Sequence, residues 1–304
     1  PAVYATLFSG LYVAMMLVLF SLFFRPAGFD YRSKIEDPTW RNAWDWCLFL
    51  GGTLPPILLG VLVGNLLLGL PFHLDQDLRP MYDGSFWGLL NPFALLCGVI
   101  GVLLTTFHGG LFLKWRTQGP VRERSRQAVD RLGLLLLMAV AVATVWLIAG
   151  IDRPEITAMA GTGAPSNPLN KTVAAQGAGW LAHFVAHPWM LLAPVLAVAG
   201  LLLAWLLGRG AADRDAFIAS SVGITSALLT VGFGLFPFLL ISTTDPKSSL
   251  TLWDASSSRL TLLIAFWITV VFLPIVLLYT RWVYKILWGS ITEKTILNDT
   301  HTLY

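Results

Sequence analysis

The sequence is short of charged residues. Only 12% of its 304 residues are Asp, Glu, Lys or Arg, whereas average soluble domains carry about 25%. Hydrophobic residues make up 56% of the chain, and the mean hydropathy is +0.70. This composition excludes an ordinary soluble domain and predicts a polytopic membrane protein. The 13 tryptophans fit that class, because Trp is enriched at membrane interfaces. The net charge of +3 is too small to argue for a nucleic-acid partner.

Cysteine and phosphate-binding motifs are equally scarce. The two cysteines, Cys47 and Cys97, stand in apolar stretches, where a lone cysteine behaves as a small hydrophobe. Two cysteines do not make a Cys-based zinc or iron–sulfur site. The sequence contains no GxGxxG or GxxxxGK[ST] run after a strand. It also has no three-part signal peptide. It starts at Pro1 and enters an apolar run at once, so we expect the first part of the protein to be absent from this sequence.

Long apolar runs are what the chain does have. A membrane-spanning helix needs roughly 20 mostly apolar residues. Seven segments meet this requirement, at about 2–24, 44–70, 86–112, 132–151, 188–208, 215–241 and 258–282. We therefore predict an all-α integral membrane protein with seven spans. Pro55-Pro56 should kink the second span, and Pro274 lies in the last.

Basic residues divide the connections into two classes. Segments 25–43, 113–131, 209–214 and the tail after the last span contain fifteen Lys and Arg residues, whereas the alternate connections contain five. The positive-inside rule places the basic side, and with it the C-terminus, in the cytoplasm. The run Arg122-Glu123-Arg124-Ser125-Arg126 is interpreted as a topology determinant that touches anionic lipid.

A short internal repeat appears at an offset of 166 residues. Pro71-Phe72, Pro80 and Trp87 recur as Pro237-Phe238, Pro246 and Trp253. In both copies an outward-going helix ends at Pro-Phe and an inward-going helix starts after Trp. A parallel repeat of this kind favours two similar four-helix bundles over an inverted-repeat transporter.

Arg25 and Asp30 are the best functional candidates. They follow the first apolar run and bring a cation and a carboxylate to the inner end of a membrane bundle. Such a pair can hold water and pass protons. The alternative is that Arg25 only extends its head group to the cytoplasmic interface.

Four further polar or amphipathic residues are structural or subunit-contact candidates. Asn65 and Asn91 are expected to form interhelical hydrogen bonds. Asp254 is expected to cap the last span or stand in its first turn. The alternative for Asp254, with Trp253 beside it, is contact with a partner subunit at the outer face.

Histidine supports a metal or heme site only weakly. His108 lies in the third span, but a bis-His heme would need a second histidine at similar depth, and no other span offers one. His183 and His187 share a helical face, yet no nearby Glu or Cys completes a metal set. A structural role is expected for all three, and no metal site is predicted.

Several motifs resemble one known family. They are Arg25-Pro26-Ala27-Gly28-Phe29-Asp30-Tyr31-Arg32-Ser33-Lys34, Gly64-Asn65-Leu66-Leu67, Gly69-Leu70-Pro71-Phe72, Leu90-Asn91-Pro92-Phe93, Ser166-Asn167-Pro168-Leu169-Asn170-Lys171, Phe236-Pro237-Phe238, Ser249-Leu250-Thr251-Leu252-Trp253-Asp254, Leu260-Thr261-Leu262 and Asn298-Asp299-Thr300-His301-Thr302-Leu303-Tyr304. Together they resemble subunit II of bacterial cytochrome bd quinol oxidases, of the ubiquinol type. The resemblance covers essentially the whole chain.

The resemblance implies a fold. Subunit II of that family has nine helices, arranged as two four-helix bundles and one peripheral helix. Seven spans here would mean that the first two are missing. Residues 1–151 would then hold the incomplete first bundle, and residues 152–304 the second bundle and the peripheral helix, within one integral membrane domain of the bacterial inner membrane.

The resemblance also implies a function. The complex oxidises quinol and reduces dioxygen to water, taking protons from the cytoplasm. Subunit I carries the b and d hemes. Subunit II ligates none, supports subunit I and contributes to proton uptake. Small single-helix subunits, lipid and a structural ubiquinone are the further partners it suggests. The family's acidic residues in the first two helices fall outside this chain, which leaves Arg25 and Asp30 as the nearest proton-path candidates.

The residues alone also leave a second class open. A secondary transporter or export permease would need a polar site at mid-membrane depth on broken helices. The chain places few ionisable residues there, which counts against this class.

Overall fold

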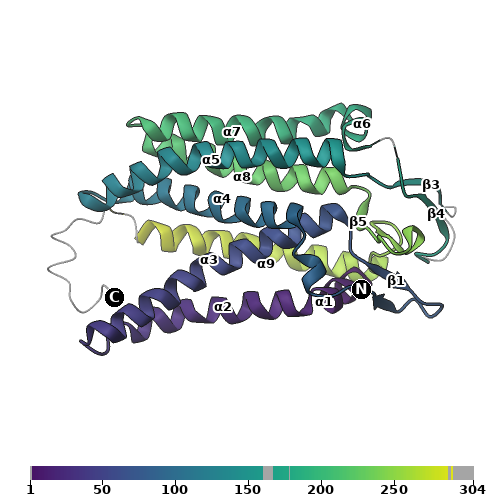
Figure 1. The fold of residues 1–304 in the computed structure, drawn as a ribbon, viewed down its shortest axis with the longest axis horizontal. Helices are drawn as coiled ribbons and strands as arrows, with labels where there is room; N and C mark the ends of the chain where they lie inside the picture. Colours follow the sequence, from purple (N-terminus) through teal and green to yellow (C-terminus); the bar gives the residue numbers. More distant parts are fainter. Residues whose placement is uncertain (1, 160–166, 178, 287–288, 290–304) are drawn as a thin grey trace.

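The computed structural model describes residues 2–159, 167–177, 179–286 and 289. Within them lie seven helices long and apolar enough to cross a membrane, as predicted. Their bounds are α2 Tyr12–Tyr31, α3 Pro38–Leu68, α4 Pro92–Arg116, α5 Pro120–Gly150, α7 Leu192–Arg209, α8 Asp213–Leu235 and α9 Arg259–Ile286. A short helix, α1 Ala2–Gly10, precedes α2. The long helices run side by side along the long axis of the molecule (Figure 1).

The two ends of the bundle differ in structure. At the end called inner here, α2 passes to α3, α4 to α5, and α7 to α8, each through a short turn. At the outer end lie α1, the short helices η1 Trp87–Leu89, α6 Gly179–Ala186, η2 Pro188–Leu191 and η3 Pro246–Ser248, and six short strands. The inner end carries the basic connections and is the predicted cytoplasmic side.

Five predicted helix boundaries are wrong by six residues or more. The second span is predicted to start at 44 and the third at 86, but α3 begins at Pro38 and α4 at Pro92. The predicted first span is divided into α1 and α2 at Leu11. The first span was ended at residue 24 but α2 continues to Tyr31, and the fourth was started at 132 but α5 begins at Pro120. The sixth was continued to 241, but α8 ends at Leu235 and a strand follows. At residues 24, 44 and 132 the predictions stop at the change from apolar to charged side chains, but backbone hydrogen bonding has no such requirement, so the helices run on past the membrane interface. The sixth span is predicted too long because apolar residues continue past Leu235 into the strand.

Four helices close into a ring. α4 packs on α5, α5 on α7, α7 on α8, and α8 on α4. The buried centre of the ring is apolar and consists of Phe107, Leu111, Val129, Leu136, Leu201, Ala204, Ala216 and Ala219. α7 and α8 approach closely at Gly200 and Gly223, where a Cβ on Gly200 would lie 2.8 Å from the Gly223 Cα. Small residues at such crossings are typical of membrane helix pairs.

The ring does not follow the predicted division at residue 151. It takes α4 and α5 from one side of that position and α7 and α8 from the other. α3 packs along α4, and α2 along α3. α2 and α3 therefore extend from the ring as a pair. The order of the helices along the chain does not record which of them pack together.

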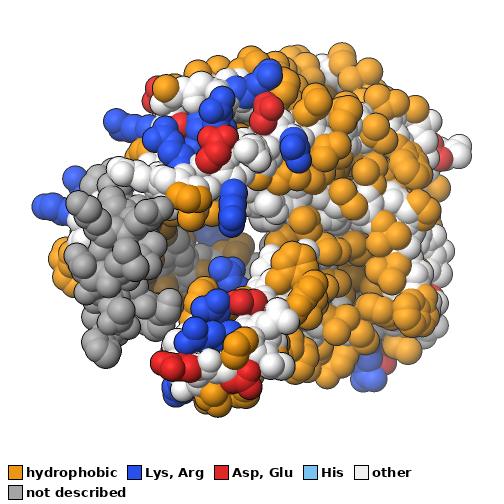
Figure 2. All heavy atoms as spheres, turned by 60° about the vertical axis from the view of Figure 1, so that its left-hand side comes forward, with side chains coloured by type: hydrophobic (Ala, Val, Ile, Leu, Met, Phe, Trp, Pro, Cys, Tyr) orange, Lys and Arg blue, Asp and Glu red, His pale blue; other side chains and the backbone are white. Residues whose placement is uncertain are grey.

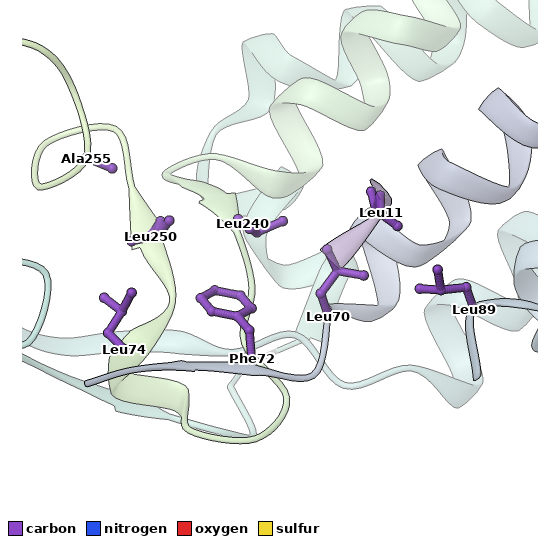
Figure 3. Close-up of a cluster of buried hydrophobic side chains, with 8 residues drawn as sticks. All are labelled: Leu11, Leu70, Phe72, Leu74, Leu89, Leu240, Leu250 and Ala255. Atoms are coloured by element: carbon purple, nitrogen blue, oxygen red, sulfur yellow. The ribbon is translucent and has the colours of Figure 1, made fainter. Parts of the chain in front are cut away.

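The outer end has its own hydrophobic core. β1 Phe72–Leu74 pairs with β2 Pro80–Tyr82, β3 Glu155–Met159 with β4 Lys171–Ala174, and β5 Phe238–Leu240 with β6 Leu250–Thr251, all antiparallel. Figure 3 shows the core residues Leu11, Leu70, Phe72, Leu74, Leu89, Leu240, Leu250 and Ala255. We call this assembly the outer cap. It joins segments far apart in sequence.

The 166-residue repeat persists in the outer cap. β1 begins at Phe72 and β5 at Phe238, and the two copies meet through a parallel bridge between Leu70 and Ser242. Leu70 N–H donates to the Ile241 carbonyl at 2.9 Å. The copies then diverge, since α4 packs into the ring whereas α9 has no buried residue. α9 is the peripheral helix of this chain.

Candidate functional site

Arg25 and Asp30 lie within α2, not in a loop after it. The helix continues through Pro26, whose missing hydrogen bond membrane helices tolerate. The two residues are five apart and therefore do not share a helix face. Both side chains are exposed, and among the described residues neither forms a hydrogen bond or ion pair. The structure therefore does not bring them together as a site.

A different ion pair joins α2 and α3 at this inner end. Arg32 Nε lies 2.5 Å from Asp45 Oδ1, and its Nη2 lies 3.1 Å from Oδ2. This two-pronged contact joins the end of α2 to the second turn of α3. Deeper in, Gly51 lets α3 approach α2, because a Cβ there would come within 3.0 Å of Arg25 Cγ. The aliphatic stem of Arg25 thus lies against α3 while its head group is exposed.

Asn65 and Asn91 meet at the outer ends of α3 and α4. Asn91 Nδ2 donates to Asn65 Oδ1 at 3.1 Å, and Asn91 Oδ1 caps α4 by accepting from Ala94 N–H at 2.8 Å. Asn65 Nδ2 in turn donates to the carbonyls of Val61 and Leu89, both at 2.8 Å. Asn65 is buried. The pair ties α3, α4 and η1 together with its polar groups satisfied.

Asp254 does not cap the last span, which begins at Arg259, five residues later. It forms a buried ion pair instead. Its Oδ2 lies 2.7 Å from Lys171 Nζ, and its Oδ1 accepts from Thr251 N–H at 2.7 Å. Lys171 also donates to the Pro168 carbonyl. The N-cap prediction failed because the chain makes a further turn in the outer cap before α9 starts.

Trp253 is half exposed and packs edge-to-face on Phe236, with ring centroids 5.9 Å apart. It therefore lies on the surface of the outer cap. The structure leaves its predicted contact with a partner subunit as a prediction.

The histidines occupy both ends of the bundle. His108 Nδ1 lies 2.7 Å from the hydroxyl of Ser220, and its ring stacks on Phe217 at 4.5 Å. His183 and His187 are at the outer end, so neither lies at the depth of His108. Across the described ranges, no three His, Cys, Asp or Glu side chains gather in a way that could hold a metal ion.

Arg153 is a buried cation that sequence reasoning missed. Its Nε donates to the Gly234 carbonyl at 3.1 Å and its Nη2 to the Phe236 carbonyl at 2.6 Å, so it stabilises the C-terminal end of α8. His183 Nε2 lies 3.0 Å from the Phe233 carbonyl in the same turn. Burial, and then the charge of Arg153, lower the pKa of His183. His183 therefore stays neutral and donates to that carbonyl.

Lys114, Asp213 and Arg122 form a second network that the sequence did not reveal. Lys114 is 2% exposed and donates to the carbonyls of Gly208 at 2.8 Å and Gly210 at 2.7 Å. Asp213 Oδ1 lies 2.7 Å from Lys114 Nζ, in the geometry of an ion pair and not a hydrogen bond, and its Oδ2 accepts from Arg122 at 2.8 Å. The sequence did contain a signal for this pair, because Lys114 lies near the end of one predicted span and Asp213 lies just before the start of another. The topology prediction uses Lys114 only as a basic residue of segment 113–131, and it does not use Asp213.

Comparison with known proteins gives a consistent result. Residues 1–287 match the family model described as cytochrome bd terminal oxidase subunit II. The chain is 46% identical over its whole length to cytochrome bd-I ubiquinol oxidase subunit 2 of Escherichia coli K12, and covers 80% of that protein. It is 41% identical over its whole length to the probable cytochrome oxidase subunit 2 of Haemophilus influenzae, again covering 80%.

A solved structure agrees on the fold. The bd oxidase of Geobacillus thermodenitrificans has a chain that matches with a TM-score of 0.60 and 19% identity, covering 90% of this chain and 73% of that one. At this identity the match supports the arrangement of helices alone. These comparisons give no support to a secondary transporter or export permease.

Proposed function

Because the chain belongs to the family of subunit II of cytochrome bd terminal oxidases, we propose that it supports a heme-bearing subunit I and helps to deliver protons for reduction of dioxygen to water. Membership makes it a subunit of a membrane-embedded respiratory oxidoreductase that contains hemes and a partner subunit I. The finer proposal is that the complex oxidises ubiquinol, that the b and d hemes all reside in subunit I, and that this chain ligates none.

The histidine placement supports a chain without heme. A bis-His heme at His108 would need a second histidine at its depth. The other histidines in the described part are His73, His183 and His187, and all three lie at the outer end. Nothing in the function proposed for this chain requires one of its own side chains to ligate iron.

The proposed role in proton uptake rests on two residues at the inner end of α2. Arg25 and Asp30 are exposed charged residues on a helix that otherwise presents apolar side chains such as Phe20 and Phe23. An ionisable group on a spanning helix is by default a functional candidate. Asp30 would hold a proton or water at the cytoplasmic entrance, and Arg25 would hold water near it. The excess of Lys and Arg at this end supports its cytoplasmic assignment, and with it a cytoplasmic C-terminus.

The test measures quinol-dependent oxygen uptake of the purified complex, with heme content checked by absorption spectra. Asp30→Asn and Arg25→Gln are made separately, and Asp45→Asn serves as the matched control, because Asp45 is a neighbouring exposed carboxylate already paired with Arg32. Slower turnover in Asp30→Asn at full heme content, with Asp45→Asn near wild type, supports the proposal. Full turnover in both Asp30→Asn and Arg25→Gln would leave the chain a scaffold without a proton role.

Outer-cap residues are the proposed contacts for other subunits. Trp253 is an exposed aromatic on that surface, and aromatic residues are enriched where protein interfaces form. We extend the proposal to single-helix accessory subunits and a structural ubiquinone only as partners of the family, because no residue here singles out their sites. Loss of subunit I from complexes purified with Trp253→Ser would support the contact.

A further inference from the structure

We propose that a pocket at the inner end of the four-helix ring binds the phosphate head group of an anionic phospholipid. The cavity has a volume of about 310 Å³. It lies between the end of α4, the start of α5 and the turn from α7 to α8. Its lining consists of Lys114, Gly119, Arg122, Glu123, Arg126, Arg209, Gly210 and Ala211. We call it the inner basic pocket.

The charge of the pocket favours an anion. Its lining has four cationic side chains and one carboxylate. The two segments that form it, 113–131 and 209–215, contain eight Lys and Arg residues against four Asp and Glu. In Figure 2, Lys and Arg side chains gather at this end of the molecule, bordered by hydrophobic side chains. When Asp213 and Asp130, which pair with Lys114, Arg122 and Arg209, are included, the pocket still has a net positive charge that an anionic head group would neutralise.

Two of the arginines, Arg122 and Arg126, have N–H groups available to bind a phosphate. Arg122 uses Nη2 for Asp213 and is 46% exposed at its side chain. Among the residues that the structure describes, Arg126 pairs only with Glu123, at 3.8 Å between exposed groups, which is a weak contact. The two arginines are four residues apart on α5 and so share a helix face. Arginine presents its N–H groups in a fork that matches phosphate oxygens.

The other two cations of the pocket already have partners. Lys114 is fixed by two carbonyls and Asp213, and Arg209 lies 2.9 Å from Asp130. α5 begins after Gly119, which has no side chain to cap the first turn. The positive end of this helix therefore adds to the field that Arg122 and Arg126 create in the cavity. Lys114 is therefore held in place before any anion binds.

Position favours a lipid over a free phosphate. Lys114 and Arg209 stand in the last turns of apolar spans, so the pocket lies where the spans leave the membrane. Leu113, Val121 and Leu206, beside the pocket residues in sequence, are 45%, 47% and 50% exposed. Basic pockets between helices on the cytoplasmic side are typical sites for anionic head groups, and exposed apolar side chains can lie along acyl chains.

The experiment uses the purified, delipidated oxidase complex and native mass spectrometry. The complex is titrated with phosphatidylglycerol, with phosphatidylcholine as the zwitterionic comparison. A basic residue near a membrane surface contributes about 1 kcal/mol towards anionic lipid. Arg126→Gln should therefore weaken tight phosphatidylglycerol binding about fivefold, and Arg122→Gln by a similar factor, with phosphatidylcholine unaffected. Arg126→Gln is the cleaner variant, because it leaves Asp213 paired.

Arg124→Gln is the matched control, because Arg124 is a cation of the same segment that does not line the pocket. An equal loss in Arg124→Gln, or none in Arg126→Gln, would refute the site. Displacement of the lipid by low-millimolar inorganic phosphate would identify a free-anion site and overturn the lipid assignment. The readout is bound lipid, so the result is independent of the oxygen-uptake test for Arg25 and Asp30.

Discussion

Asp213→Asn should destabilise the protein strongly. The substitution keeps the shape of the side chain but removes the charge that compensates Lys114, which is 2% exposed. Lys114 would retain its hydrogen bonds to Gly208 and Gly210, but its charge would lie 2.7 Å from a neutral amide. Removing one partner of a buried ion pair costs about 3–5 kcal/mol. At roughly 2 °C per kcal/mol, the melting temperature should fall by about 6–10 °C.

Replacing both partners should recover much of that loss. The double variant Asp213→Asn with Lys114→Met leaves no uncompensated charge, and apolar replacements of buried ion pairs are often close to neutral. It still loses two hydrogen bonds to the end of α7, so we expect partial recovery, by about 1–3 kcal/mol. A double-mutant cycle with the single Lys114→Met variant isolates the coupling.

The measurement is thermal unfolding of the complex in nanodiscs, followed by intrinsic tryptophan fluorescence. Asp215→Asn is the matched control, because Asp215 is an exposed acid in the same first turn of α8 with no ion pair among the described residues. It should change stability by less than about 0.5 kcal/mol. If Asp213→Asn melts like Asp215→Asn, the buried pair does not hold the inner end together and the reasoning is wrong.

Three further predictions test other parts of the fold. The Tyr82 hydroxyl is buried without a partner among the described residues, so Tyr82→Phe should be neutral or stabilising by about 1 kcal/mol in thermal unfolding; a loss above that would reveal a missed partner. The folded-state pKa of His183 is lowered, so the unfolded chain binds more protons and stability should fall as pH drops below 6.5; melting curves of His183→Gln should flatten this dependence, and an unchanged slope would assign it elsewhere. A Cβ on Gly60 would lie 2.3 Å from the Cys97 carbonyl, whereas one on Gly52 meets nothing within 4 Å, so Gly60→Ala should cost about 1–3 kcal/mol and Gly52→Ala should be neutral or stabilising; equal melting temperatures would contradict the close helix contact.

Sequence patterns predicted the spans well because burial in lipid imposes one strong rule. A helix in the hydrocarbon core must be mostly apolar, so Leu- and Val-rich runs predict the spans directly. The rule says nothing about which helices pack together. The ring of α4, α5, α7 and α8 therefore crossed the predicted boundary at residue 151. An apolar side chain can face either lipid or a neighbouring helix, because both surroundings are apolar.

The polar residues were harder to place from sequence. Asn65 and Asn91 were identified because an amide inside a span needs a partner. Asp254 was assigned to the next helix, although its partner, Lys171, lies 83 residues earlier. The pairing of Lys114 with Asp213 was not predicted, because it depends on how α4 meets α8. Long-range pairing of this kind is set by tertiary packing, which no local pattern records.

The outer cap also limits how early the protein can finish folding during its synthesis. Its first half, around Leu74, hydrogen-bonds to Ser248, which is 174 residues further along the chain. At 5–20 residues per second, the ribosome needs roughly 9–35 s to supply that second half. Until α8 has been inserted, the backbone groups around Leu70 have no partner from the other copy. A chain stalled within α5 or α7 would therefore show an unfinished outer surface, which quality-control proteases could distinguish from the finished one.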